Sequence, residues 1–277
     1  MWTQRALQAA KMAAATAVGL PLWMYLRQER LLFERSTLSA EEAARIRGEH
    51  GHAEELRFEA RDGTRLHGWL VRPRIEAPCP LLIYYGGNNE EVSSCIAHQA
   101  SLGDRALLLV NYRGYGLSRG RPSEAALLDD ALLILDAVAA RRDVDARRIS
   151  VMGRSLGSGV AVHVAARRPV RHIVLVTPYD SIVHLAQRRY PYVPVRPLLK
   201  HPFDSLSRAA AIRQPALFVT ATSDEVIPAL HSRILHDAWG GPKTWLQLPG
   251  TDHANIADHA GYWPAITAFL GAGGSPD

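Results

Sequence analysis

The sequence of 277 residues is poor in cysteine, with only Cys79 and Cys95. These two form neither a C-x-x-C pair nor a metal-ligand pattern, so we expect buried or idle thiols, and they leave the redox compartment open. Aromatic residues make up only 7% and are not interleaved with a basic patch. The sequence therefore does not predict a basic surface with aromatic side chains of the kind that binds nucleic acids. The sequence predicts no metal site, no cofactor and no nucleic-acid partner.

Basic residues are also not concentrated in any one segment of the sequence. The net charge is +5, but the 32 lysines and arginines are scattered along the chain. A scattered excess favours contact with anionic surfaces such as membranes only weakly. Repeats and low-complexity tracts are missing too. The length suits one large α/β domain with a small insertion, and 47% hydrophobic residues are enough to build a full core.

Long hydrophobic runs are missing except near the amino terminus, where residues 12–26 are apolar and uncharged between Lys11 and Arg27. A helix of this length rises about 22 Å, against roughly 30 Å for a hydrocarbon core, but both flanking cations can snorkel. A cleaved signal peptide fits less well, because the small residues precede the most apolar part. We predict that residues 1–35 are an uncleaved leader whose residues 12–26 anchor the protein to a membrane. An amphipathic leader docked on the folded domain is the alternative, and the side of the membrane stays open.

The rest of the chain alternates between strand and helix patterns. Predicted helices cover Glu124–Ala140, with Ser123 as N-cap, Val160–Ala166 and Tyr262–Leu270. Predicted strands are Glu55–Ala60, Thr64–Val71, Pro80–Tyr85, Ala106–Asn111, Ile149–Met152, Ile173–Val176, Ala216–Thr220 and Thr244–Leu248. This order predicts an α/β fold with a mostly parallel central sheet, helices on both faces and an antiparallel hairpin at one edge. Residues 36–54 would connect the leader to a domain spanning residues 55–272.

The most informative segment is Gly153-Arg154-Ser155-Leu156-Gly157, a G-x-S-x-G pattern between a predicted strand and a predicted helix. Strand, sharp turn and helix form the context of a nucleophile elbow. The turn strains the serine backbone, and the two glycines relieve the crowding beside it. The hydroxyl would stand over the carboxyl end of the sheet, at the positive end of the helix. We predict that Ser155 is a nucleophile; a glycine-rich turn with an incidental serine is the alternative.

A serine nucleophile needs a base, and the base needs an orienting carboxylate. His253 directly follows the last predicted strand, where such a base must lie, and we predict it as the base. Asp224 follows the strand at Ala216–Thr220 and is the predicted acid. Glu225 is the runner-up. Asp252 is a third candidate, although its short tether to the histidine disfavours a good geometry.

An acyl-transfer site also needs two backbone N–H groups that stabilise the developing oxyanion. One is expected from Leu156, the residue after the nucleophile. The other is expected from the loop Gly86-Gly87-Asn88-Asn89, which follows the strand at Pro80–Tyr85. We predict Asn88 as this second donor, with Gly87 as the alternative.

Residues 181–208 differ in composition and are predicted to form a small cap over the site. The segment Ala186–Pro202 is rich in proline, aromatic and basic residues, and it begins just past the carboxyl end of a strand. A packed connecting loop stiffened by its prolines is the alternative. The side chains that we expect to line an acyl or alkyl pocket are Tyr190, Tyr192, Val193, Val195, Leu198 and Leu199.

Together, these positions resemble the α/β-hydrolase superfamily from about Glu55 to Leu270. They are most similar to its serine-aminopeptidase-like branch, which includes membrane-anchored lipid and acyl-protein hydrolases. Residues 111–118 (NYRGYGLS) match the Y-R-G-Y-G-x-S motif of that branch, and residues 153–159 (GRSLGSG) and 224–228 (DEVIP) also fit it. We expect the Y-R-G-Y-G stretch to shape the sheet edge near the site. Two positions depart from the family pattern: Gly86 stands where His is usual, and Ala221 where Gly is usual.

The resemblance implies a serine hydrolase that cleaves carboxylic esters or thioesters of a lipid or acyl substrate through a covalent acyl-enzyme. Serine at the elbow argues against the dehalogenase and epoxide-hydrolase reactions of the same fold. One alternative is an aminopeptidase or amidase, which would need an acidic group for the substrate amine beside a basic cap. Another is a non-catalytic binding protein, although no triad member is missing. Acyl chain length and leaving group stay open.

Overall fold

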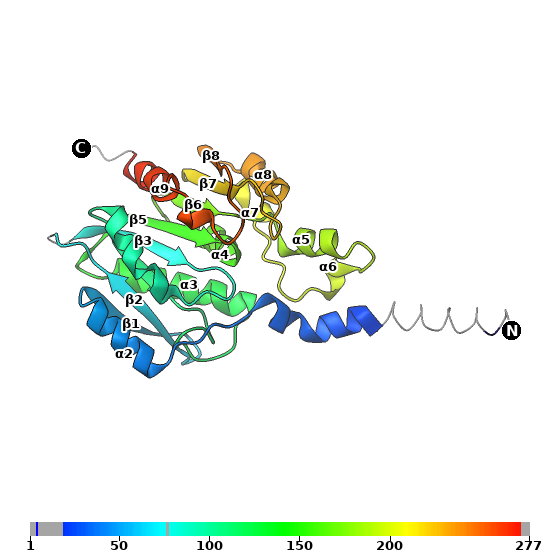
Figure 1. Cartoon of the computed structure of the whole chain (residues 1–277), viewed down its shortest axis with the longest axis horizontal. Helices are drawn as coiled ribbons and strands as arrows, with labels where there is room; N and C mark the ends of the chain where they lie inside the picture. The colour runs from blue at the N-terminus through cyan, green and yellow to red at the C-terminus, as the bar shows by residue number, and fades with distance from the viewer. Residues whose placement is uncertain (1–3, 5–18, 76–77, 273–277) are drawn as a thin grey trace.

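The computed structural model describes residue 4, residues 19–75 and residues 78–272. Within these residues the chain forms an eight-stranded sheet with the order β1-β2-β4-β3-β5-β6-β7-β8 (Figure 1). β1 pairs antiparallel with β2, and β2 with β4, whereas all other neighbours run parallel. The bounds are β1 Ala53–Glu59, β2 Arg65–Val71, β3 Cys79–Tyr85, β4 Ala106–Val110, β5 Val144–Arg154, β6 Ile173–Val176, β7 Ala216–Ala221 and β8 Lys243–Leu248. The predicted mostly parallel sheet with an antiparallel edge hairpin is confirmed.

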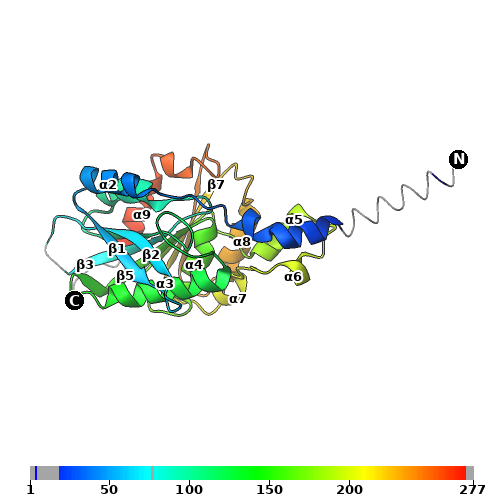
Figure 2. The same cartoon turned by 90° about the horizontal axis from the view of Figure 1, so that it is seen from below.

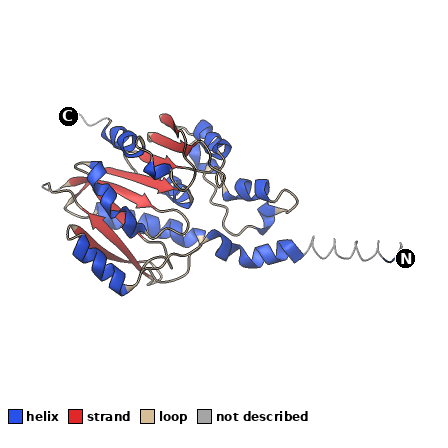
Figure 3. Cartoon of the chain, in the orientation of Figure 1, coloured by secondary structure: helices blue, strands red, loops and turns tan. Residues whose placement is uncertain are grey.

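Helices cover both faces of this sheet, as predicted (Figure 3). One face packs against α3 (Glu124–Ala139), α4 (Leu156–Ala165) and α8 (Ala229–Ala238). The other packs against α2 (Ala40–Glu49), the 3₁₀ segment η1 (Val92–Leu102) and α9 (Tyr262–Gly271). Ser123 is the N-cap of α3, as predicted, and its side chain accepts from the Ala126 N–H. The sequence patterns did not predict η1.

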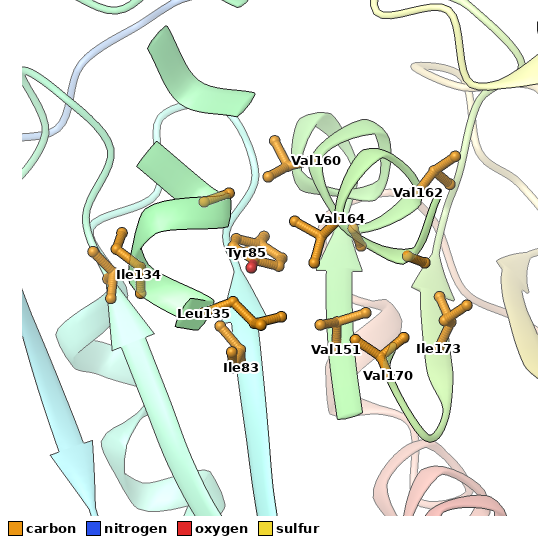
Figure 4. Packing of buried hydrophobic residues seen from close by; sticks show 14 of the residues in the cluster. Ile83, Tyr85, Ile134, Leu135, Val151, Val160, Val162, Val164, Val170 and Ile173 are labelled. Carbon is orange, nitrogen blue, oxygen red and sulfur yellow. The ribbon is translucent and has the colours of Figure 1, made fainter. Parts of the chain in front are cut away.

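Alternate residues of the strands supply two separate cores. Ile83 of β3 and Val151 of β5 face α3 and α4, whose side chains close over them in Figure 4. Their neighbours Leu82 and Met152 point to the other face, toward η1 and α9. Each such fully buried aliphatic side chain contributes about 1.5–3 kcal/mol of transfer free energy. Strands buried on both faces explain why β3 and β4 read as unbroken apolar runs.

The chain between β6 and β7, here called the insertion, carries three short helices: α5 (Ile182–Arg189), α6 (Val195–Leu198) and α7 (Leu206–Ala209). Residues 19–32 form a helix, here called the leader helix, that lies beside α5 and α6 at one end of the molecule (Figures 1 and 2). Gln28 fastens it there: its Nε2 donates to the Leu198 carbonyl at 3.0 Å, and its Oε1 accepts from the Lys200 N–H at 2.7 Å. Leader and insertion therefore form one lobe beyond the carboxyl ends of the parallel strands.

The predicted anchor at residues 12–26 lies outside the described residues as far as residue 18. Its remaining part, residues 19–26, belongs to the leader helix. In the described part of the chain, no helix combines the length and the apolar character that a membrane crossing requires.

Candidate active site

The turn between β5 and α4 places Ser155 in a strained conformation, with φ 51° and ψ −119°. A non-glycine residue at positive φ is uncommon and marks functional sites. The surrounding packing enforces it: a Cβ at Gly153 would overlap the Gly157 carbonyl oxygen, and one at Gly157 would overlap the Tyr85 carbonyl oxygen. The Ser155 N–H donates to the Val176 carbonyl at 2.9 Å, which ties the turn to β6. The geometry is that of the elbow predicted from the G-x-S-x-G pattern.

The structure brings together the three side chains predicted for catalysis, from loops after three different strands. Nε2 of His253 lies 3.0 Å from Oγ of Ser155, and its Nδ1 lies 2.8 Å from Oδ2 of Asp224. Oδ1 of Asp224 accepts from the N–H groups of Val226 and Ile227 at 2.9 and 2.7 Å. The Asp224 side chain is only 3% exposed, whereas that of His253 is 18% exposed. A carboxylate held from behind by two backbone donors thus presents its free oxygen to the imidazole.

The two other predicted acids lie elsewhere. Glu225 is exposed on the surface of the same loop as Asp224. Asp252 caps its own loop, because its Oδ1 accepts from the N–H groups of Ala254 and Asn255 at 2.8 and 2.9 Å. These backbone hydrogen bonds lower the pKa of Asp252. Of the three candidates, Asp224 alone contacts the His253 ring.

The loop at residues 86–89 lies beside Ser155 and contains the second predicted oxyanion donor. The Gly87 N–H, the alternative donor, is already engaged: it donates to Oε2 of Glu90 at 2.6 Å. Oδ1 of Asn88 accepts from the Glu34 N–H at 2.8 Å and from the Tyr115 hydroxyl at 3.0 Å. Among the described residues, no hydrogen bond engages the N–H groups of Asn88 or Leu156. These are the two amides that the sequence predicts for the oxyanion.

The Y-R-G-Y-G stretch supports this loop directly, in a more specific way than shaping a sheet edge. The Tyr112 hydroxyl donates to the Gly86 carbonyl at 2.9 Å, and the Tyr115 hydroxyl reaches the Asn88 side chain. Arg113, between them, binds both carboxylate oxygens of Asp130 on α3 at 2.6 and 2.8 Å. The stretch therefore joins the 86–89 loop to the helix layer. Sequence reasoning located the stretch but could not tell what its two hydroxyls bind.

A second carboxylate–histidine cluster, which sequence reasoning missed, lies beneath the insertion. The fully buried Asp180 lies 2.8 Å from Nδ1 of His231 on α8 and 2.5 Å from Nδ1 of His184 on α5. Burial acts to raise the pKa of Asp180, but the hydrogen bonds from His231, His184 and the Ser181 backbone hold it below its usual range. This cluster fastens α5 to the body of the domain.

An apolar groove of about 320 Å³ lies between the leader helix and the insertion. Five of the six side chains predicted to line an acyl pocket line it, but the prediction for Tyr192 was wrong, because this residue is 98% exposed and lies outside the groove. The leader helix supplies the opposite wall, so residues 19–32 are docked on the folded domain, which was the alternative expected for the leader. The lining consists of Pro21, Met24, Tyr25, Gln28, Leu31, Leu32, Ile182, Ala186, Tyr190, Val193, Val195, Leu198 and Leu199.

The groove is separate from the Ser155 site, since Ser155 is not part of its lining. The chain itself links the two: Leu32 lines the groove, and Glu34, two residues later, pairs with the 86–89 loop. The Asn89 N–H donates to the Glu34 carbonyl at 2.9 Å, which makes this a two-point contact. Over the ranges that the structure describes, no cluster of three or more His, Cys, Asp or Glu side chains is arranged to hold a metal ion.

Comparisons with known proteins agree with the α/β-hydrolase fold and identify a family. The serine hydrolase family matches residues 131–272, a range that includes Ser155, Asp224 and His253. The Mycobacterium tuberculosis protein Rv2307c (strain H37Rv) is 32% identical over 96% of this chain and 95% of its own length. A yeast protein named as the membrane protein YNL320W is 28% identical over 60% of each chain. Among solved structures, an acetyl xylan esterase from Paenibacillus sp. R4 superimposes with a TM-score of 0.66 at 22% identity, covering 89% of this chain and 99% of the esterase.

Proposed function

The chain belongs to the serine hydrolase family, and from this premise we propose that it hydrolyses carboxylic esters or thioesters of acyl substrates. Ser155 is the nucleophile, His253 the general base and Asp224 the orienting acid. The observation that carries the proposal is the continuous relay Ser155–His253–Asp224, with contacts of 3.0 and 2.8 Å. These distances lie within the reach required for proton transfer and for fixing the imidazole tautomer.

In the first half-reaction, Oγ of Ser155 attacks the substrate carbonyl carbon while its proton passes to Nε2 of His253. A new C–O bond forms, and the carbonyl electron pair moves onto oxygen. The N–H groups of Leu156 and Asn88 would receive this oxyanion, and each such donor is worth roughly 3–4 kcal/mol in the transition state. The imidazolium, stabilised by Asp224, then protonates the leaving alcohol or thiol as the bond to it breaks.

In the second half-reaction, His253 removes a proton from water, and the hydroxide attacks the acyl-Ser155 ester. The tetrahedral intermediate collapses to the free carboxylic acid, and Ser155 regains its proton from the imidazolium. The cycle needs no redox partner.

The apolar groove supports acyl chains as the part of the substrate that is recognised. Its walls are formed almost entirely by aliphatic and aromatic side chains, as in binding sites for apolar ligands. The esterase of similar fold adds support for ester chemistry as such. We therefore propose that the acyl chain extends from Ser155 toward the groove between the leader helix and the insertion.

We also propose that the lobe formed by leader and insertion meets a lipid surface. Leu22, Trp23 and Leu26 of the leader helix are 54%, 52% and 68% exposed, and Leu26 follows Leu22 by four positions and Trp23 by three, so the three side chains share one side of the helix. Exposed cations on the same lobe are Arg27, Arg30, Arg188, Arg189, Arg196 and Lys200. Apolar side chains beside cations suit the interface of an anionic membrane. A relative named as a membrane protein is consistent with this.

The proposed activity is tested by Ser155→Ala with p-nitrophenyl butyrate as substrate. Removal of the nucleophile should lower kcat by about 10⁵–10⁶-fold, as expected for a residue that acts as one unit with its base. Ser101→Ala, an exposed serine on η1, is the matched control and should keep the activity of the unmodified protein. Hydrolysis by the Ser155→Ala protein at the unmodified rate would contradict the proposal.

A further inference from the structure

Two charged residues behind the nucleophile, Glu90 and Arg154, join loops that the sheet keeps apart. Glu90 directly follows the 86–89 loop after β3, and Arg154 is the last residue of β5. His253 lies in the loop after β8, here called the histidine loop (residues 249–255). β5, β6 and β7 lie between β3 and β8, so no strand pairing links the 86–89 loop to the histidine loop.

The Glu90 carboxylate is held on both of its oxygens. Oε2 accepts from the Gly87 N–H at 2.6 Å and from Nη1 of Arg154 at 3.2 Å. Oε1 accepts from the Tyr84 hydroxyl at 2.7 Å. The side chain is only 15% exposed. A charge-assisted hydrogen bond to a backbone amide at this distance is among the stronger kinds, so Glu90 determines the direction of the chain at Gly87.

Arg154 uses its second nitrogen for the other loop. Its Nη2 donates to the His253 carbonyl oxygen at 2.9 Å, across 99 residues of sequence. Burial opposes the charged form of Arg154, but the nearby Glu90 carboxylate raises its pKa above the ordinary value, so the guanidinium stays charged. A planar guanidinium holds two partners in one fixed geometry, which a lysine ammonium does not.

Glu90 and Arg154 each contact the backbone beside a group that the proposed reaction uses, namely the Asn88 N–H and the His253 ring. With the Gly87 N–H directed to Glu90, the next amide along the chain is that of Asn88, which no described hydrogen bond engages. At the other end, Arg154 holds the backbone of the residue whose ring lies 3.0 Å from Oγ of Ser155. The position of the oxyanion donor and that of the base therefore depend on the same ion pair.

We propose that Glu90 and Arg154 are positioning residues, which hold the 86–89 loop and the histidine loop at the spacing that turnover requires. This inference rests on the proposed esterase or thioesterase function. Neither residue touches the reacting atoms; both act through the backbone of the residues that do. The link also gives a structural role to Arg154, which occupies the unspecified position before the serine in the G-x-S-x-G pattern.

The test compares Glu90→Gln, Arg154→Met and the double variant in turnover of p-nitrophenyl butyrate. Loss of the link should lower kcat by about 10- to 100-fold, the cost of misplacing reacting groups by a fraction of an ångström to 1 Å. KM should stay within about threefold, because substrate contacts are unchanged. The double variant should lose no more than the worse single variant, since both remove one shared interaction. Arg154→Lys, which keeps the charge but not the fork, should recover kcat in part.

The matched control is another arginine–carboxylate pair, Arg168 with Asp136, whose two contacts are both 2.7 Å and which lies on the exposed surface. Arg168→Met and Asp136→Asn should leave kcat unchanged. Unchanged kcat in Arg154→Met, or strictly additive losses in the double variant, would overturn the inference.

Hydrogen exchange separates a failure of this inference from a failure of the proposed function. Arg154→Met should speed exchange in residues 86–90 and 249–255 together, whereas Arg168→Met should speed neither. If the unmodified protein hydrolysed no ester, the proposed function would fail, but coupled exchange in the two loops would still support the link. Exchange that rises in one loop alone, or in neither, would refute it.

Discussion

At the scale of single residues, the Asp224 carboxylate is held in one orientation by the backbone of its own loop. Two backbone N–H groups, from Val226 and Ile227, occupy one oxygen and so orient the other toward His253. Asp224 and its two donors lie within four consecutive residues, 224–227, of the loop between β7 and α8, whereas the side chain of neighbouring Glu225 is exposed. The carboxylate would fix the imidazole tautomer and stabilise the imidazolium without accepting its proton.

Asp224→Asn should therefore preserve the fold and impair the chemistry. An amide of the same shape favours the wrong tautomer of His253, so kcat for p-nitrophenyl butyrate should fall by about 10³–10⁴-fold. Glu225→Gln, one residue away and exposed, is the matched control and should keep kcat within about twofold, as for a surface substitution. Equal losses in the two variants would exclude Asp224 as the specific acid.

At the scale of elements, the leader helix and the insertion complete each other. Neither α5 nor α6 can bury its apolar side alone, since α5 contains no buried residue and α6 has only four residues. The leader helix closes the groove and continues at Glu34 into contact with the 86–89 loop. A segment far from Ser155 in the sequence thus contributes both a wall of the proposed acyl site and support for the proposed oxyanion donor.

Filling the groove should change chain-length preference without changing the chemistry. Ala186 of α5 lines the groove, and Ala186→Trp places a large ring in a space of about 320 Å³. Turnover of a long-chain ester, p-nitrophenyl palmitate, should fall by at least about tenfold in kcat/KM, because several buried methylenes at about 0.8 kcal/mol each would be lost. Turnover of p-nitrophenyl acetate should not change.

Ala137→Trp, at an exposed position of α3, is the control for adding a tryptophan and should leave both substrates unaffected. An equal fall for acetate and palmitate esters in Ala186→Trp would argue against the groove as the acyl site.

At the scale of the whole molecule, the leader helix lies with α5 and α6 at one end (Figure 2), and this lobe carries exposed apolar and basic side chains. Six of the 32 lysines and arginines of the chain are exposed on this lobe, together with the exposed leucines of the leader helix. An amphipathic surface of this kind binds a lipid interface through buried apolar area and electrostatic attraction together. Such binding would bring the groove entrance to the acyl chains of the lipid.

The full-length protein is expected to co-sediment with vesicles of phosphatidylcholine and phosphatidylserine, and less with phosphatidylcholine alone, because each cation near an anionic surface adds about 1 kcal/mol. Leu26→Asp should weaken binding by about tenfold or more, the transfer free energy of one leucine side chain. Leu230→Asp on α8, also more than half exposed, is the control and should bind like the unmodified protein. Equal effects of the two substitutions would contradict a specific docking face.

Much of the fold could be predicted from the sequence because its signals are local. The alternating pattern around Arg61-Asp62-Gly63 predicts the β1–β2 hairpin, and the apolar run before Gly153 predicts the carboxyl-terminal half of β5. The 3₁₀ segment η1 was missed although its buried residues Val92, Ile96, Gln99 and Leu102 recur every three or four positions, because Ser93-Ser94 and Gln99 dilute the apolar signal.

The contacts between loops could not be predicted, since they join residues far apart in the chain. Glu34 and Asn88 are separated by 54 residues, and Arg154 and His253 by 99. No periodic pattern carries such information, because these distances depend on how the helix and sheet layers pack. The same holds for Tyr112 and Tyr115. Both were recognised as part of a sequence motif, but the motif did not predict that their hydroxyls donate hydrogen bonds to the 86–89 loop.

The sequence by itself determined the α/β order of elements, the elbow at Ser155 and the succession of Ser155, Asp224 and His253 in loops after parallel strands. These depend on local sterics and on the rule that parallel strands bring their carboxyl ends to one edge. Only the tertiary structure decided that the backbone N–H of Gly87 is hydrogen-bonded while that of Asn88 has no partner within the described ranges. It also decided that Tyr192 faces solvent and that the leader helix forms one wall of the groove. The ion pair between Glu90 and Arg154 also depends on the tertiary structure. The two side chains meet only when the strands and loops that carry them are packed together.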